Sequence, residues 1–317
     1  MCPLPVSGRR GSRTPGLGVC GMGHDGGMSP IPVPPIRPER VRRIAVVAAK
    51  GGGGLLGVGT ALAGAAIGVI VVQVALARRS IGPRRTVPPY ADGRYLPPGE
   101  LVARGTSFRL AVLGDSGAAG LGADEPEDTP GAVIARELAA AVGRPVLLTN
   151  SATVGAQTRD LSWQVDRIVA VRPHVAVIMV GANDLTHSVR PQLSVRLLGE
   201  AVARLREVGC EVVVGTCPDL GTVKPLAMPL RQYARRMSRE LAAAQRIAVV
   251  ANGGRAVQLG ELLGELFDSD PDLYFSADRF HPSAAGDAAC AHALLPEVLA
   301  ALGLGAESSG LPALPSA

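Results

Sequence analysis

From Arg109 onward, short apolar segments alternate with longer stretches of helical periodicity, and this alternation constrains the fold more than any other feature. The predicted strands are 109–114, 146–150, 174–180, 211–216 and 246–251, and the predicted helices are roughly 130–142, 158–171, 192–208, 229–245, 255–265 and 284–302. Strands that are separated by helices pair in parallel and are covered on both faces. The sequence therefore predicts an α/β domain with a five-stranded parallel sheet over residues 108–302.

The positive charge of the chain is confined to its N-terminal third. The 317 residues carry a formal net charge of +5. Residues 1–100 hold 13 Lys and Arg against 4 Asp and Glu, a net of +9, whereas residues 101–317 hold 19 against 23, a net of −4. A nucleic-acid-binding domain concentrates basic residues on its folded part. We therefore expect no nucleic-acid partner.

The segment 55–77 is a run of 23 residues without a charge, and Gln73 is its only strongly polar member. About 20 apolar residues span a bilayer core, so the run predicts one N-terminal transmembrane helix that acts as a signal anchor. We expect a cell-membrane protein with a single pass and its folded domain outside the cytoplasm. Secretion after cleavage near Ala77 is the alternative.

The segments around this run have the composition of linkers and tails. Residues 1–43 are rich in Gly, Pro and Arg and are predicted to be disordered. Residues 78–107 form a Pro-rich linker, and residues 303–317 form a disordered tail. The sequence Lys50-Gly51-Gly52-Gly53-Gly54 resembles a phosphate loop, but Leu follows where Lys-Ser or Lys-Thr is needed. Nucleotide binding is therefore not expected.

Four short motifs follow predicted strands or precede the last predicted helix. They are Gly114-Asp115-Ser116, Asn150 with Gly155, Gly181-Ala182-Asn183-Asp184, and Asp278-Arg279-Phe280-His281. In open α/β sheets, ligands bind at the carboxyl ends of the strands, so we expect the motifs to lie together. They supply a hydroxyl nucleophile, a histidine with a carboxylate three residues away, and hydrogen-bond donors. Acyl transfer requires that set of groups.

With these four motifs in this order, residues 108–302 resemble the SGNH/GDSL hydrolase family of GDSL-like lipases and esterases. The family often has Leu after the serine, where this chain has Gly117. The resemblance implies a flavodoxin-like three-layer α/β/α fold. It also implies hydrolysis of ester bonds without a metal ion or an organic cofactor.

The resemblance assigns a role to each motif residue. Ser116 would be the nucleophile, His281 the general base and then the acid, and Asp278 the carboxylate that orients the histidine. The oxyanion hole would consist of the Ser116 and Gly155 backbone N–H groups and the Asn183 side chain. Gly114, Asp115, Asn150 and Asp184 would be supporting residues, and the two aspartates are expected to cap or brace their loops.

Other conspicuous side chains have structural explanations in the sequence. His187 is expected in a solvated loop, with substrate contact as the alternative, and Trp163 is expected to pack. The arginines 231, 235, 236 and 239 predict a solvated basic helix face. The apolar residues of 223–230 could form a lid or acyl-binding wall, or equally part of the core. A disulfide between Cys217 and Cys290 stays open.

The sequence favours a serine esterase that hydrolyses short- to medium-chain acyl or acetyl esters through an acyl-enzyme. An α/β-hydrolase-type lipase is an alternative, because Gly114 to Ala118 nearly fits the pattern Gly-x-Ser-x-Gly. A non-catalytic surface binding module on the same fold is another. The expected partners are a small-molecule ester or lipid substrate and, through residues 55–77, a membrane.

Overall fold

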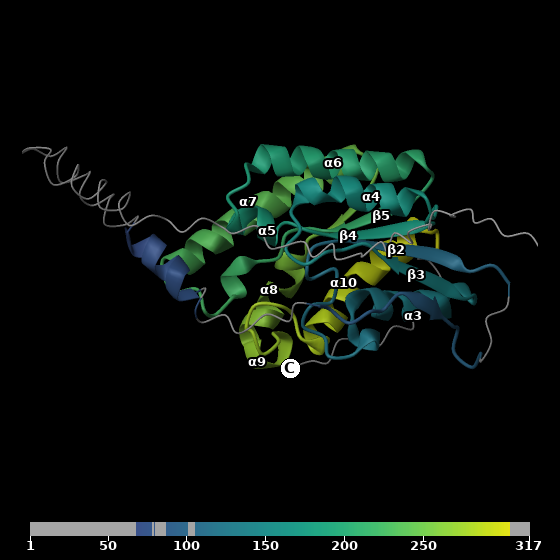
Figure 1. The fold of residues 1–317 in the computed structure, drawn as a ribbon, viewed down its shortest axis with the longest axis horizontal. Coiled ribbons are helices and arrows are strands. Elements are labelled where there is room, and N and C mark those ends of the chain that lie inside the picture. The colour runs from purple at the N-terminus through teal and green to yellow at the C-terminus, as the bar shows by residue number, and fades with distance from the viewer. Residues whose placement is uncertain (1–67, 78, 80–86, 101–104, 305–317) are drawn as a thin grey trace, which may run out of the picture. The chain divides into compact units, whose positions relative to one another are not determined.

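The computed structural model describes residues 68–77, 79, 87–100 and 105–304, and its centre is a six-stranded mixed sheet (Figure 1). The strands are β1 (Gly93–Tyr95), β2 (Phe108–Gly114), β3 (Val146–Asn150), β4 (Val175–Met179), β5 (Glu211–Gly215) and β6 (Arg255–Val257). Their spatial order is β1-β3-β2-β4-β5-β6. β1 pairs with β3 antiparallel, and every other neighbouring pair is parallel.

Helices cover both faces of the sheet. One face carries α3 (Pro130–Val142), α8 (Leu259–Ser269) and α10 (Ala284–Ala301), and the other carries α4 (Leu161–Val169), α6 (Pro191–Glu207) and α7 (Leu230–Ala251) (Figure 1). The short elements are α5 (Ala182–Thr186), α9 (Pro271–Tyr274) and the 3₁₀ helices η1 (Pro126–Asp128), η2 (Thr158–Asp160) and η3 (Leu220–Thr222). The central strand β4 is wholly buried, and its alternate side chains belong to the two cores.

The predicted five-stranded parallel sheet is wrong at both ends of the sheet. The segment 246–251 is not a strand but the last part of α7, and the edge strand β6 lies further on at Arg255–Val257. No Gly or Pro interrupts α7 before Asn252, so the apolar residues extend the helix instead of beginning a strand. Within this stretch Val249 is buried, whereas Ile247 is 73% exposed.

The strand β1 lies inside the segment that was predicted to be a linker. It has three residues, too few to show an alternating pattern, and prolines lie on both sides of it at 88–89 and 97–98. Its antiparallel pairing with β3 covers the edge of the sheet that the parallel strands would otherwise leave open.

The predicted transmembrane helix over 55–77 is wrong, because no helix among the described residues is long and apolar enough to cross a membrane. Residues 68–77 are helical. Residues 55–67, like the segments 1–43 and 305–317, lie outside the described residues. The expected location of the folded domain outside the cytoplasm stays a prediction.

Candidate active site

The turn after β2 places Ser116 at the carboxyl edge of the sheet. β2 ends at Gly114, where φ is +133° and a Cβ would lie 1.9 Å from the carbonyl oxygen of Met179. Only glycine fits at that position. The next residue, Asp115, donates its backbone N–H to the same carbonyl at 3.0 Å, so the chain turns directly against the end of β4. Ser116 is 7% exposed.

The loop between α9 and α10 brings His281 to Ser116. The His281 Nε2 atom lies 2.9 Å from Ser116 Oγ, and the His281 Nδ1 atom lies 2.6 Å from Asp278 Oδ2. Both ring partners and the ring itself are buried. Arg279 adopts a φ of +59° between them, which tightens the loop. Ser116, His281 and Asp278 therefore form one hydrogen-bonded line, although 165 residues separate the first two.

Asp278 is surrounded by groups that favour its ionised form. Its Oδ1 atom accepts hydrogen bonds at 2.9 Å from the backbone N–H groups of Phe280 and His281 and from the Ser276 hydroxyl. Burial by itself would raise the pKa of Asp278, but the hydrogen bonds from the His281 side chain and from these backbone groups lower the pKa well below its ordinary value. A carboxylate in this state can orient the imidazole and stabilise its charged form.

Gly155 lies in the loop after β3, and a hydrogen bond joins this loop to Asn183 in α5. Asn183 lies in α5, and its Nδ2 atom donates to the Ala156 carbonyl at 3.0 Å. Gly155 is exposed and has a φ of +81°. The Thr153 backbone N–H donates to the carbonyl of Gly114 at 3.1 Å, which ties this loop to the end of β2. The loops after β2, β3 and β4 are therefore connected.

Asn150 and Asp115 brace the turn that contains the serine. The Asn150 side chain accepts a hydrogen bond from the Ala152 backbone at 2.8 Å and donates to the Ala118 carbonyl at 3.2 Å. It therefore links the end of β3 to the loop after β2. Asp115 accepts a hydrogen bond from the Gly117 backbone N–H at 3.0 Å.

Asp184 links α5 to η2. Its carboxylate accepts hydrogen bonds from the Thr158 backbone N–H at 3.2 Å and from the Thr158 hydroxyl at 2.6 Å. That hydroxyl also lies 3.0 Å from the Ser194 hydroxyl. Burial raises the pKa of Asp184 against the opposing effect of the Thr158 hydrogen bonds. Burial also raises the pKa of Asp115 to about 6, although the Gly117 N–H opposes the shift.

Two buried glutamines that sequence reasoning missed hold the strand ends. The Gln164 side chain on α4 accepts from the Gly114 N–H at 2.7 Å and donates to the Gly114 carbonyl at 2.9 Å. The Gln245 side chain on α7 accepts from the Cys217 N–H at 2.7 Å and donates to the Val180 carbonyl at 3.1 Å. The sequence does indicate these residues, because each is an amide on the apolar face of its helix. A buried amide needs hydrogen-bond partners, so such a glutamine is expected to bind nearby backbone groups.

Ser116 and His281 line an apolar cavity of about 120 Å³. Its walls come from the end of β4, from η3 and from α8. The apolar lining includes Met179, Leu220, Val223, Leu259, Leu263 and Phe267. No Lys or Arg is among the described residues that line it. The cavity can therefore hold an uncharged, largely apolar group next to the serine.

The residues that could have formed a lid lie in different environments. Val223 lines the cavity and is 3% exposed, and Leu230 is buried at the start of α7. Met228 is 59% exposed, and Leu226 is partly buried against the core. The segment 223–230 therefore contributes Val223 to the cavity wall and does not act as one apolar unit.

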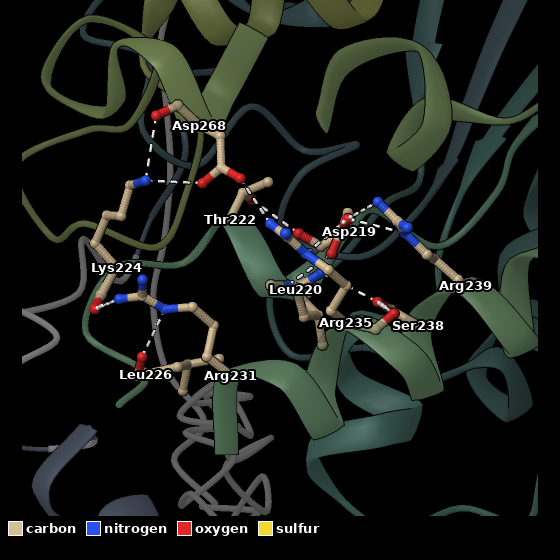
Figure 2. A network of polar contacts seen from close by, with 11 residues as sticks. Asp219, Leu220, Thr222, Lys224, Leu226, Arg231, Arg235, Ser238, Arg239 and Asp268 are labelled. Atoms are coloured by element: carbon tan, nitrogen blue, oxygen red, sulfur yellow. Dashed lines mark hydrogen bonds and ion pairs between the residues drawn. The ribbon is translucent and has the colours of Figure 1, made fainter. Parts of the chain in front are cut away.

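Ion pairs connect the two walls of the cavity (Figure 2). Asp219, directly before η3, has a side chain that is 1% exposed and lies 3.0 Å from Arg239 Nη2 and 3.3 Å from Arg235 Nε. Arg235 also donates to Asp268 at 2.7 Å, and Lys224 Nζ lies 2.8 Å from the same carboxylate. Asp268 lies near the end of α8, so α7 joins the η3 wall to the α8 wall.

The arginines that were predicted to form a solvated face divide into two groups. Arg235 and Arg239 reach the buried Asp219, and Arg231 donates to backbone carbonyls of the loop before α7. Arg236 remains at the surface, where it is 78% exposed and pairs with Glu240 one turn along the helix.

Of the other conspicuous side chains, Cys290 lines the cavity, whereas His187, Trp163 and Cys217 do not. His187 is exposed, with its Nδ1 atom 2.9 Å from the Asn183 carbonyl, and Trp163 is 39% exposed instead of packed. Cys217 and Cys290 are free thiols. Within the part of the chain that the structure describes, no group of three or more His, Cys, Asp or Glu side chains could hold a metal ion.

Comparisons with known proteins relate the chain to ester hydrolases. Residues 112–289 match the GDSL-like lipase/acylhydrolase family. The chain is 42% identical over 251 residues to the GDSL-like esterase Rv1075c of Mycobacterium tuberculosis, and the alignment covers 76% of this chain and 79% of that protein. Two solved structures are similar at lower identity. The lipase/acylhydrolase from Enterococcus faecalis is 22% identical, with a TM-score of 0.47 over 60% of this chain and 95% of that chain. Axe2, an acetylxylan esterase from Geobacillus stearothermophilus, is 20% identical, with a TM-score of 0.45 over 61% and 95%.

Proposed function

Because this chain belongs to the GDSL-like lipase/acylhydrolase family and is a hydrolase of ester bonds, we propose that it acts as a serine esterase that forms an acyl-enzyme on Ser116. The observation that carries the proposal is the hydrogen-bonded line from Ser116 through His281 to Asp278, next to an apolar cavity. A hydroxyl within reach of a base, which a third group orients, is the arrangement that nucleophilic catalysis needs.

The first half of the reaction acylates the serine. His281 Nε2 takes the proton from Ser116 Oγ as that oxygen attacks the ester carbonyl carbon, and a tetrahedral oxyanion forms. The protonated His281 then gives its proton to the alcohol oxygen, the bond between the carbonyl carbon and that oxygen breaks, and the alcohol leaves. Asp278 holds the ring and stabilises its positive charge throughout this step.

The proposed oxyanion hole consists of the backbone N–H groups of Ser116 and Gly155 and the side chain of Asn183. Among the described residues, neither of these two backbone groups donates to a protein acceptor, and Asn183 uses only one of its amide hydrogens. One preorganised donor of this kind typically contributes about 2.7–4 kcal/mol to the stability of the transition state. The three free donors support the assignment.

The second half of the reaction hydrolyses the acyl-enzyme. A water molecule gives a proton to His281 and attacks the acyl carbon, the same donors hold the oxyanion, and His281 returns the proton to Ser116 Oγ as the carboxylic acid leaves. These steps use only side chains and backbone groups of the chain itself. No cofactor takes part in them.

The proposed substrates are esters of short- to medium-chain acyl groups, acetyl included. The support is the apolar lining of the cavity beside Ser116 and its limited volume of about 120 Å³. The non-catalytic binding module does not hold, since the chain is an ester hydrolase. Because residues 112–289 match the GDSL-like family, we propose the GDSL-type esterase instead of the α/β-hydrolase-type lipase.

Labelling with a fluorophosphonate probe tests the nucleophile. We expect the wild type to be labelled and Ser116→Ala to stay unlabelled. Ser151→Ala is the matched control, because Ser151 is also buried and follows the next strand, yet its hydroxyl has no histidine partner. The Ser151 variant should label like the wild type. Equal labelling of Ser116→Ala and the wild type would refute the proposal.

Hydrolysis of aryl esters of increasing acyl length tests the substrate class. We expect the highest kcat/KM within the acetyl, butyryl, hexanoyl and octanoyl esters, with His281→Ala as the inactive control. A kcat/KM that keeps rising beyond twelve carbons would contradict the short- to medium-chain assignment while leaving the serine mechanism in place.

A further inference from the structure

Two buried polar groups in the apolar cavity have no hydrogen-bond partner among the described residues. Asp287, in the first turn of α10, is 1% exposed, and its Oδ2 atom makes no hydrogen bond. Thr216, directly after β5, is 1% exposed, and its Oγ1 atom makes none either. Both residues line the cavity that Ser116 lines. Each unpaired group costs about 1–3 kcal/mol, which is recovered only when a polar partner enters the cavity.

No Lys or Arg among the described residues that line the cavity compensates the Asp287 carboxyl group. The nearby charge that shifts its pKa is the negative charge of Asp128, which disfavours ionisation. Burial raises the pKa of Asp287 well above its ordinary value, and Asp128 shifts it in the same direction. Burial without a cation favours the neutral carboxylic acid, which donates through its O–H and accepts through its carbonyl oxygen.

Cys290, which lies almost one helical turn after Asp287, also lines the cavity. Burial raises the pKa of the Cys290 thiol, so it stays neutral beside Asp287. A thiol is only a weak donor and acceptor, and it therefore does not replace the missing partner. Among the described lining residues, the strong hydrogen-bonding groups without a partner are therefore those of Asp287 and Thr216.

We propose that Asp287 and Thr216 form a polar subsite in the cavity, which binds a hydroxyl group carried by the acyl chain of the substrate. The proposal rests on the proposed serine esterase function, because the cavity is where the acyl chain of that reaction would lie. A hydroxyl matches the subsite since it donates and accepts, as the carboxylic acid and the threonine hydroxyl do. The esterase therefore prefers hydroxyacyl esters to plain esters of equal length.

The ratio of kcat/KM between hydroxylated and plain acyl esters tests the subsite. The probes are aryl esters of 3-hydroxybutyrate and 6-hydroxyhexanoate against butyrate and hexanoate. We expect the wild type to prefer at least one hydroxylated ester by about tenfold. Asp287→Leu should abolish the preference and Thr216→Val should lower it severalfold. Asp287→Asn keeps a neutral donor and acceptor, so this variant should retain most of the preference for the hydroxylated ester.

Thr222 provides a matched control in the same cavity. It is also a buried threonine in the lining, but its hydroxyl already donates to the Asp219 carbonyl at 2.8 Å. Thr222→Val should leave the ratio between hydroxylated and plain esters unchanged. If Asp287→Leu does not fold, the contrast between Thr216→Val and Thr222→Val still decides the proposal.

The failure of the subsite and the failure of the serine esterase give different results. A wild type that hydrolyses butyrate and hexanoate esters, with the same ratio in all variants, would overturn the subsite alone. A wild type that hydrolyses none of the esters would overturn the serine esterase proposal together with the subsite. A preference for 6-aminohexanoate over 6-hydroxyhexanoate would mean that Asp287 is ionised, and it would also overturn the subsite as proposed.

Discussion

The proposed catalytic line and the wall of the cavity beside it are held by different kinds of contact. Ser116, His281 and Asp278 are buried and joined by hydrogen bonds of 2.9 and 2.6 Å. The wall depends on Asp219 and Asp268, whose arginine and lysine partners are between about a third and two thirds exposed. The first region is held by hydrogen bonds between buried side chains, whereas the second depends on long, partly exposed side chains that join separate elements.

This difference separates two properties of an esterase. Contacts around the reacting atoms act on the transition state and therefore on kcat. Contacts that set the distance between η3 and α8 act on how the acyl group fits, and therefore on KM and on chain-length preference. Substitutions in the catalytic line should therefore change kcat, and substitutions in the wall should change KM. The effects in the line should be larger than those in the wall.

The largest effect is expected at Asp278. Asp278→Asn keeps the shape of the side chain but removes the charge that orients His281, and kcat should fall about 10⁴-fold. Ser276→Ala is the control, since it removes only one of the hydrogen bonds to the same carboxylate and should cost less than tenfold. A loss below tenfold in Asp278→Asn, with an unchanged Tm, would break the assignment of Asp278 to the catalytic line.

A smaller loss is expected at Asn183. Asn183→Ala removes one proposed oxyanion donor, so kcat should fall about 10²- to 10³-fold with little change in KM. Steady-state kinetics on a butyryl ester measure both constants. An increase in KM at constant kcat would mean that Asn183 binds the substrate in the ground state. Asn183 would then belong with the residues of the wall and not with the catalytic residues.

The contacts among Ser116, His281 and Asp278 could be predicted from the sequence better than the ion pairs of the wall. Asp278 and His281 are three residues apart, and Ser116 follows a recognisable apolar strand, so short motifs and the rule for parallel sheets are enough to bring them together. Asp219 and Arg235 come from separate elements, and no motif in the sequence between them predicts that they form an ion pair. Asp287 was missed for the same reason, because only the packed cavity shows that it lacks a partner.

The errors in the fold also have a local cause. The apolar segment 246–251 satisfies the pattern of a buried strand, but it continues α7 since no helix-breaking residue precedes it. β1 has only three residues and is defined by its pairing with β3, a tertiary contact that periodicity does not report. Strands in the centre of the sheet, such as β4, were predicted to within one residue at each end because burial on both faces leaves a continuous apolar run.

Asp115, next to the nucleophile, should make stability depend on pH. Burial raises its pKa in the folded state to about 6 from 3.8, so the folded protein binds this proton more tightly than the unfolded chain does. The resulting stabilisation is present below pH 4 and is lost as the pH rises through 6. Asp115→Asn should therefore gain up to about 3 kcal/mol over the wild type at pH 8 and almost nothing at pH 4.

Urea unfolding of the two proteins at pH 4 and pH 8 measures that difference. The Asn side chain can still accept the hydrogen bond from Gly117, so the turn should persist. A gain of equal size at both pH values would show that the effect comes from packing and not from the charge of Asp115. A loss at pH 8 would mean that the ionised carboxylate is stabilised by its surroundings, in contrast to the direction of its pKa shift.

The smallest effect is expected in the wall. Arg235→Ala disconnects Asp219 from Asp268 but leaves Asp219 paired with Arg239, so the free energy of unfolding should fall by about 1–2 kcal/mol. KM for a hexanoyl ester should rise a fewfold because the η3 and α8 walls separate, while kcat stays within about twofold.

Arg236→Ala on the same helix is the matched control. Its pair with Glu240 lies in solvent, and neither stability nor KM should change measurably. A fall in kcat of the size expected for Asn183→Ala would mean that the wall positions the reacting atoms, and the distinction between the two regions would no longer hold.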